Sequence, residues 1–416
     1  MAKKNIAFTL LALVWLMRSP ASAATVIASA GTIDTATSHP QQRQLFYDGT
    51  RWWAFYFKST GADRLYYAYS SNLTSWTETN KLLPSTVSLT GKPLSIWFDS
   101  ATATVIVPYY TDATNNVRYV RGNISGTSIT WSATTLYNDD EINCDVCCDK
   151  GVYATIDSNN KVIISDCQSD YEVFRSTNSI STSFADTAAQ WNSLGTTVTS
   201  QTTFYYKIIP KASGELLAIT SDSSSYIETW EYNGSGWNVL PWIGYSNFNL
   251  GSNPTLNWDA VKISNTAIYI LAVTSAGFSF QRYDGSGYDP TDYTALAVPS
   301  QPSGGLATNS GVSLVTDGTD IWAFVIRGDA NSTVSYSRYL VAVNNWTGWA
   351  DVTATSEGRA YVQVSQNTGN GTIGVLWTQV NGSDYDIAVA SISTAVYPPP
   401  DVTVIHDAVI RDAVIQ

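Results

Sequence analysis

The stretch QLFYDGTRWWAFYF, residues 44–57, decides the fold. Its first four residues predict a short strand, and the Asp-Gly pair that follows is a strong hairpin signal between apolar runs. Residues 52–57 are wholly apolar, which predicts a strand buried on both faces. A third strand over residues 65–69 and a fourth that starts near Trp76 complete a four-stranded unit.

This unit recurs along the chain. Its starts lie near residues 44, 94, 152, 207, 260, 312 and 360, a period of about 50 residues. Short strands at such a period predict a β-propeller with one four-stranded blade per repeat. We therefore expect an all-β fold, a seven-bladed β-propeller, over residues 24–396. It should form one domain, because no blade can bury both faces without neighbours.

The two ends of the propeller region complement each other. The seventh repeat lacks an outer strand of its own, while residues 25–30 form an orphan strand before the first repeat. An N-terminal strand that closes the last blade would remove open sheet edges, which otherwise invite aggregation.

Both termini differ from the repeats. Residues 1–23 resemble a signal peptide, with Lys3 and Lys4, an apolar run over 6–17 and the small residues 21–23 before a cleavage point. We expect a secreted, extracellular protein with no membrane insertion. Residues 397–416 form a Pro-rich spacer and a short repetitive tail, which is either the start of a second repeat module or a docking segment.

The net charge of the chain limits the classes of partner that it can bind. The chain has 13% charged residues and a net charge of −12. The signal segment holds three basic residues and no acid, so the mature charge is −12 − 3 = −15. Such a chain repels nucleic acid and anionic membrane surfaces. The plainer interpretation is that an acidic surface keeps a secreted protein soluble.

Four cysteines lie close together in the sequence: Cys144, Cys147, Cys148 and Cys167. In an exported chain two disulfides are the default expectation. Adjacent cysteines rarely pair with each other, which leaves 144–147 with 148–167, or 144–148 with 147–167. A zinc or iron–sulfur site is the alternative, which an oxidising compartment disfavours.

Propeller sites gather at the channel ends of the innermost strands, where all blades converge. Alignment of the repeats puts six charged residues at these positions: Arg43, Lys92, Asp149, Lys207, Asp259 and Arg359. The four cations are candidate ligand-binding residues, and arginine suits a carboxylate. Asp149 or Asp259 is the candidate catalytic acid/base on a glycosidic oxygen. The alternative is that these charges are solvated or paired with one another at a channel mouth.

Other chemistries have few residues to use. His39 is the one histidine within the propeller region, which disfavours a histidine-based triad or metal site. No phosphate-binding glycine loop occurs, and no cofactor is expected. The acidic run 139–141 beside Asp145 could hold Ca²⁺ through hard oxygen ligands, although clustered loop acids are more often solvated.

Residues 69–76, Tyr-Ser-Ser-Asn-Leu-Thr-Ser-Trp, carry a resemblance. They resemble, in degenerate form, the Ser-x-Asp-x-Gly-x-Thr-Trp box of sialidase-like secreted propellers. In that family the box is a structural turn, in which a short polar side chain bonds the turn backbone and the Trp packs underneath. Arg43 stands where the family has its first substrate arginine, followed in this chain by Gln-Leu instead of Ile-Pro.

The resemblance implies a carbohydrate-interacting propeller whose partner is an extracellular glycan. Two functions of different classes follow from it. One is a sialidase-like glycoside hydrolase. The other is a non-catalytic, lectin-like adhesion or surface-assembly module. A carboxyl pair about 5–9 Å apart in the central cleft would favour the hydrolase.

Overall fold

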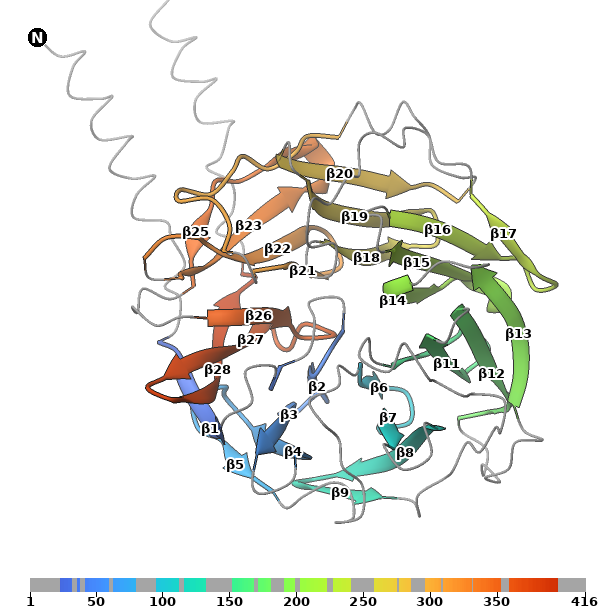
Figure 1. Ribbon diagram of the computed structural model, residues 1–416, viewed down its shortest axis with the longest axis horizontal. Helices are drawn as coiled ribbons and strands as arrows, with labels where there is room; N and C mark the ends of the chain where they lie inside the picture. Colours follow the sequence, from blue (N-terminus) through green and yellow to red (C-terminus); the bar gives the residue numbers. More distant parts are fainter. Residues whose placement is uncertain are drawn as a thin grey trace, which may run out of the picture.

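The computed structural model describes residues 23–31, 36–37, 42–59, 63–79, 95–111, 116–131, 152–167, 171–180, 191–198, 203–222, 227–240, 258–274, 277–285, 296–307, 310–330, 332–352 and 359–395. Within them, seven antiparallel sheets stand around one central axis (Figure 1). The predicted all-β, seven-bladed propeller is confirmed. In these ranges no helix has the length and apolarity needed to cross a membrane.

The first four blades each have four strands, which follow one another from the axis outward. Blade 1 comprises β2 (Leu45–Tyr47), β3 (Trp52–Ser59), β4 (Asp63–Ser70) and β5 (Thr77–Glu78). Blade 2 comprises β6 (Trp97–Asp99), β7 (Thr104–Thr111), β8 (Asn116–Ser125) and β9 (Ser128–Trp131). Blade 3 comprises β10 (Tyr153–Ile156), β11 (Lys161–Cys167), β12 (Tyr171–Ser179) and β13 (Trp191–Val198). Blade 4 comprises β14 (Thr203–Pro210), β15 (Leu216–Asp222), β16 (Ile227–Tyr232) and β17 (Trp237–Val239).

The last three blades vary the plan. Blade 5 comprises β18 (Trp258–Ser264), β19 (Ala267–Thr274) and β20 (Gly277–Tyr283). Blade 6 comprises β21 (Val312–Thr316), β22 (Ile321–Ile326), β23 (Val334–Leu340), β24 (Asn345–Trp346) and β25 (Ala350–Asp351). Blade 7 comprises β26 (Arg359–Val364), β27 (Thr372–Asn381), β28 (Asp384–Ser393) and β1 (Thr25–Gly31). Single 3-10 turns occur at Ala212–Gly214 and Val341–Val343.

The N-terminal strand closes the ring, as predicted. β1 pairs antiparallel with β28, with Thr25 opposite Val389 and Gly31 opposite Tyr385. Ala30 is fully buried and belongs to the apolar cluster of blades 7, 1 and 2. The ends of the propeller region are thus joined by backbone hydrogen bonds and by burial.

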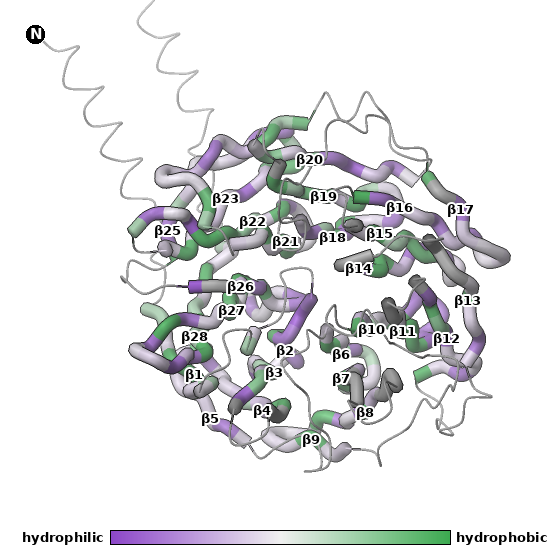
Figure 2. Tube along the Cα trace, viewed as in Figure 1, coloured by the Kyte–Doolittle hydropathy of each residue, from purple (hydrophilic) through white to green (hydrophobic). Residues whose placement is uncertain are grey.

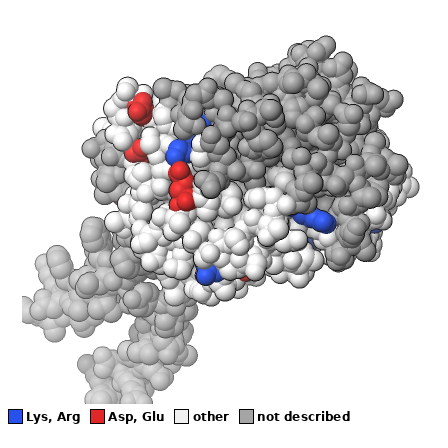
Figure 3. All heavy atoms as spheres, turned by 90° about the horizontal axis from the view of Figure 1, so that it is seen from below, with Lys and Arg blue, Asp and Glu red and all other residues white. Residues whose placement is uncertain are grey.

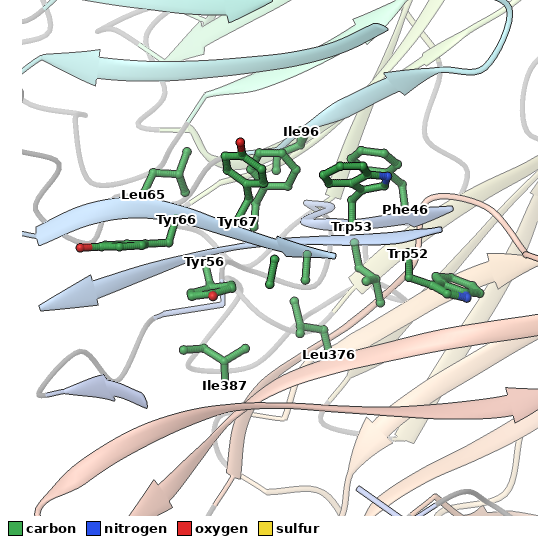
Figure 4. Packing of buried hydrophobic residues seen from close by; sticks show 14 of the residues in the cluster. Phe46, Trp52, Trp53, Tyr56, Leu65, Tyr66, Tyr67, Ile96, Leu376 and Ile387 are labelled. Carbon is green, nitrogen blue, oxygen red and sulfur yellow. The ribbon is translucent and has the colours of Figure 1, made fainter. Parts of the chain in front are cut away.

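The core lies between the blades. Figure 4 shows Trp53 and Tyr67 on one side of blade 1 near Ile96, and Tyr56 on the other side with Ile387 of blade 7. Successive strand residues point to opposite faces, so an apolar run fills both interfaces. Strands near the axis, β19 and β22 among them, are accordingly hydrophobic along most of their length (Figure 2).

Two hairpin turns next to the axis share one construction. Asp48 accepts hydrogen bonds from the amides of Thr50 and Arg51 and from the indole of Trp53. Asp317 holds the amides of Thr319 and Asp320 and the indole of Trp322 in the same way. One carboxylate therefore fixes both the turn and the tryptophan at the second position of the next strand.

The box at residues 69–76 has the expected turn geometry. The Ser70 hydroxyl accepts hydrogen bonds from the amides of Asn72 and Leu73. The Asn72 side-chain oxygen accepts hydrogen bonds from the amides of Thr74 and Ser75. The indole of Trp76 donates to the carbonyl of Leu73. The box joins β4 to β5 on the outer side of blade 1, so its role is structural.

Candidate functional site

A cavity of about 430 Å³ lies on the axis of the propeller. Every blade contributes to its wall through the inner strand or the residues beside it. From blade 1 to blade 7 these contributions include Arg43, Trp97, Tyr153, Lys207, Val261, Leu314 and Gln366. Residues far apart in the sequence are thereby brought together, as the convergence of inner strands predicts.

Three of the predicted site residues meet at this cavity, and we call them the Asp259 cluster: Arg43, Lys207 and Asp259. Arg43 Nη2 lies 2.6 Å from Asp259 Oδ2, and Lys207 Nζ lies 2.7 Å from Asp259 Oδ1. All three side chains are buried, with Asp259 fully so. Two cations share one carboxylate, so the cluster sums to one positive charge.

Asp259 faces donors only. Besides the two cations, its oxygens accept the backbone amides of Leu314 at 2.6 Å and Ala260 at 2.7 Å. Four donors suit a carboxylate that carries no proton of its own. Asp259 is 0% exposed and does not line the cavity, although Arg43 and Lys207 do.

Arg43 is engaged by protein groups across the channel. Its two terminal nitrogens donate to the Gln42 carbonyl, the Ser313 hydroxyl, Asp259 and the Leu314 carbonyl. These four hydrogen bonds use the four hydrogens of those nitrogens. The guanidinium therefore joins blade 1 to blades 5 and 6, and it is not arranged as an open fork for a ligand carboxylate.

Lys207 is engaged differently. Within the described residues its ammonium donates to Asp259 alone, which leaves two of three hydrogens for a group in the cavity. Burial lowers the pKa of Lys207, and repulsion by Arg43 lowers it further, to about 8; the Asp259 carboxylate opposes both effects. An anion beside Lys207 would add a second counter-charge.

Tyr153 completes this level of the cavity. It is buried and lines the wall, and burial raises its pKa, with Asp259 adding to the effect and Arg43 opposing it. The neutral phenol is therefore the stable form. No described residue hydrogen-bonds its hydroxyl, so this group can donate to or accept from a ligand.

A third lysine, Lys262, lines the cavity further along the axis. It comes three residues after Asp259, and its Nζ donates a hydrogen bond to the carbonyl of Pro210, which comes three residues after Lys207. Three residues of strand span about 10 Å. Burial lowers the pKa of Lys262, and repulsion by Lys211 adds to this.

Lys211 belongs to its own network between blades 4 and 5. It donates to Glu231 and, at 2.8 Å, to the Tyr283 hydroxyl, and it lies 3.3 Å from Glu215. Asp157, the one carboxylate found in the described cavity wall, is bound at 3.0 Å by Arg175 Nε. Glu215, Glu231 and Asp157 are thus all engaged by cations and leave no unpaired carboxyl group among them beside the Asp259 cluster.

Arg359 lies elsewhere. It starts β26, donates to the Ser332 carbonyl at 2.9 Å and lies over the Trp377 ring. It is not among the cavity-lining residues. A register shift between Ala360 and Gln363 alters the spacing along β26, which the repeat alignment did not include. The structure thus brings Arg43, Lys207 and Asp259 together but not Arg359.

The remaining predicted residues fall outside the described part of the chain. This holds for Lys92, Asp149 and the acidic run 139–141 with Asp145, and for the side chains of all four cysteines. The two disulfides and the calcium loop stay predictions. In the ranges that are described, no three metal-binding side chains form a cluster.

Tyr153 and Lys262 were not predicted from the sequence. Lys262 lies on the same inner strand as Asp259 and lines the cavity. An offset of three residues places the two side chains on opposite faces of the strand, so the spacing did not mark Lys262. No sequence signal marked Tyr153 as a site residue, because an aromatic residue in an apolar run usually belongs to the core. On the face in Figure 3 only a few of the described side chains are charged.

Comparisons with known proteins identify the fold and no family. No family model matches the chain, and no curated protein matches its sequence. The BP39L lectin from Burkholderia pseudomallei has a TM-score of 0.62 at 13% identity, with 85% of this chain and 97% of the lectin covered. The polysaccharide lyase Uly1 has a TM-score of 0.51 at 9% identity, with 89% and 98% covered.

A leech intramolecular trans-sialidase is also similar, at 13% identity with 89% of this chain and 70% of that chain covered. Its TM-score of 0.45 is too low to argue from. The seven sheets confirm the propeller fold that the resemblance to sialidase-like propellers implies, and membership of that family stays a prediction.

Proposed function

We propose that this protein is a secreted, lectin-like propeller that binds an acidic saccharide in its axial cavity, with the saccharide carboxylate beside Lys207. One observation carries the proposal. In a chain of net charge −12, a buried cluster of net positive charge places Arg43 and Lys207 in the wall of the axial cavity, and Lys207 keeps two hydrogens for a partner. A buried charge needs compensation by a ligand or by water.

The remainder of the wall suits a sugar ring. Trp97, Ile156 and Val261 supply apolar surface for its C–H faces, while Tyr153 and Ser158 offer hydroxyl groups. Mostly apolar walls with a few placed polar groups are typical of small-ligand sites. A saccharide with one carboxylate matches this combination better than a simple inorganic anion.

Binding is favoured over hydrolysis. Glycoside hydrolysis ordinarily needs two carboxyl groups on either side of the scissile bond, one of them able to donate a proton. Asp259 is shielded from the cavity and surrounded by donors, and Asp157 is tied to Arg175. In this proposal Asp259 positions the two cations and is not the acid/base. Asp149 lies outside the described residues.

Two further arguments support the proposal. The neighbour with a TM-score of 0.62 is a lectin, and its likeness to this chain concerns the fold. The signal-like residues 1–23 would bring this protein to the compartment where glycans are found.

A glycan-array screen of the mature protein tests the proposal. Carboxylated glycans should bind, their carboxyl-reduced counterparts should bind much more weakly, and Lys207→Met should abolish the difference. A parallel hydrolysis assay on the same glycans should detect no product. Released sugar would support the hydrolase instead, and equal binding of acidic and neutral glycans would reject the site.

A further inference from the structure

Lys207 has an environment that exceeds the needs of anion binding. We infer that Lys207 is a nucleophilic amine that captures the carbonyl group of a small carboxylated aldehyde or ketone as an imine. This rests on the proposed function for the class of ligand that enters the cavity. The chemistry, however, depends on the lysine itself and on the groups that touch it.

The cavity gives a carbonyl compound access to the amine. Lys207 lines the wall and has a single protein acceptor among the described residues, so two of its hydrogens and, once deprotonated, its lone pair are available. Tyr153 lines the same wall and can donate a hydrogen bond to a carbonyl oxygen. A bulky saccharide is not required, because any small carbonyl compound reaches this space.

Asp259 is placed to accept a hydrogen bond from the amine. Its Oδ1 lies 2.7 Å from Lys207 Nζ, which is hydrogen-bonding distance. Arg43 on the other carboxylate oxygen adds positive charge on the same side. A lysine whose pKa is lowered by a neighbouring cation is a recognised activated amine.

The acidity of Lys207 agrees with this geometry. Burial and Arg43 bring its pKa down to about 8, against about 10.4 for an ordinary lysine. A larger share of Lys207 than of an ordinary lysine is therefore neutral near pH 8. Surface lysines at that pH are almost wholly protonated and unreactive.

The other lysines of the cavity do not share this arrangement. Burial alone would lower the pKa of Lys211, but hydrogen bonds to Glu231 and Tyr283 outweigh it and raise the pKa above the ordinary value. Lys262 donates to a backbone carbonyl, which cannot take up a proton. The prediction therefore concerns one lysine only.

The reaction balances without an oxidant or a reductant. The neutral Lys207 nitrogen forms a bond to the carbonyl carbon, and one amine proton passes to the carbonyl oxygen. Loss of water from the resulting carbinolamine gives the imine, and hydrolysis reverses it. A carboxylate on the ligand is favoured on entry, when Lys207 is still protonated and the Asp259 cluster holds one excess positive charge. Attack follows once the ammonium has lost a proton to solvent.

Reductive trapping tests the inference. The full mature protein is treated at pH 8 with glyoxylate and cyanoborohydride, which reduces the imine to a stable carboxymethyl adduct. Peptide mapping then locates the adduct, since the N-terminal amine also has a pKa near 8. Acetaldehyde is the uncharged comparison probe, Lys207→Arg is the test variant and Lys58→Arg is the control, because Lys58 pairs with Glu78 on blade 1.

We expect the Lys207 peptide to carry the adduct many-fold more than any other lysine, and glyoxylate to react faster there than acetaldehyde. Lys58→Arg should leave this unchanged, and Lys207→Arg should remove it. Uniform labelling of lysines, or none at Lys207, would overturn the inference. This measurement uses the wild-type protein, so it does not depend on folding of the variants.

The Lys207→Arg variant distinguishes failure of this inference from failure of the proposed function. Lys207→Arg keeps a cation, so it should still bind an acidic saccharide although it forms no imine. Saccharide binding without trapping at Lys207 would reject this inference alone. Trapping without saccharide binding would reject the proposed function alone.

Discussion

Arg43 and Asp259, 216 positions apart in the sequence, form a buried ion pair of 2.6 Å across the channel. They belong to blades 1 and 5, which are not neighbours in a seven-bladed ring. Lys207 adds blade 4, and the Arg43 bond to the Leu314 carbonyl adds blade 6. One carboxylate thus links four blades at the axis, while β1 joins the ends at the rim.

Removal of Arg43 should destabilise the whole ring. Arg43→Met leaves Asp259 buried with one cation, and loss of one partner of a buried pair costs about 3–5 kcal/mol. Urea denaturation followed by tryptophan fluorescence measures the change. Lys58→Gln is the matched control, because it breaks a partly exposed pair with Glu78 that is worth about 1 kcal/mol or less. Similar midpoints for the two variants would contradict a structural role for the pair.

Ring closure by β1 is testable with two substitutions on one strand. Ala30 is fully buried and Val26 is 49% exposed. Ala30→Asp buries an unpaired carboxylate and should lower the melting temperature sharply, whereas Val26→Asp should change stability by about 0.5 kcal/mol or less. Deletion of residues 24–31 should act like Ala30→Asp. A deletion variant as stable as the parent would show that the ring closes without β1.

The period of the fold was visible in the sequence because inter-blade burial makes each repeat apolar in the same places. The closing strand was predictable from two matching gaps. The outer strand β13 was missed, since its WNSLGTTV sequence is mostly polar and has no alternation. A strand on the outer edge of a blade buries little, so its pattern carries little information.

The site was predictable in part for a related reason. Arg43, Lys207 and Asp259 are charges in apolar surroundings, and such charges stand out in a chain with 13% charged residues. Their roles were not visible, because the depth of Asp259 and its four donors depend on neighbouring blades. Arg359 was misaligned by the irregular register of β26, where Tyr361 has a φ of 60°.

The turn carboxylates should matter more than exposed acids. Asp317→Ala removes acceptors for two amides and for the Trp322 indole, and should cost about 1–3 kcal/mol. Asp384, exposed in the β27–β28 hairpin, is the control, and its replacement by alanine should cost about 0.5 kcal/mol or less. Equal effects in thermal unfolding would mean that the Asp317 turn does not fix the Trp322 position.

Affinity for an acidic saccharide should depend on pH through Lys207. The anion favours the protonated ammonium, so affinity is fully present well below the pKa of about 8 and is lost as the pH rises through it. Arg43 and Asp259 act on the same ammonium, and Tyr153 stays neutral in this range because burial raises its pKa. Calorimetry from about pH 6 to about pH 9.5 should show the fall in wild type, and none in Lys207→Arg, because arginine stays charged. A flat wild-type profile would place the anion elsewhere.

Calorimetric titration at pH 7 with one acidic oligosaccharide and its carboxyl-reduced counterpart tests the central claim most directly. We predict that Lys207→Met weakens binding of the acidic form about 10- to 100-fold, the range for a charge-assisted hydrogen bond, while Lys207→Arg retains most of it. The reduced form should bind weakly to all three proteins. Wild-type affinity in Lys207→Met, with its fold intact, would contradict the axial cavity as the acidic-glycan site.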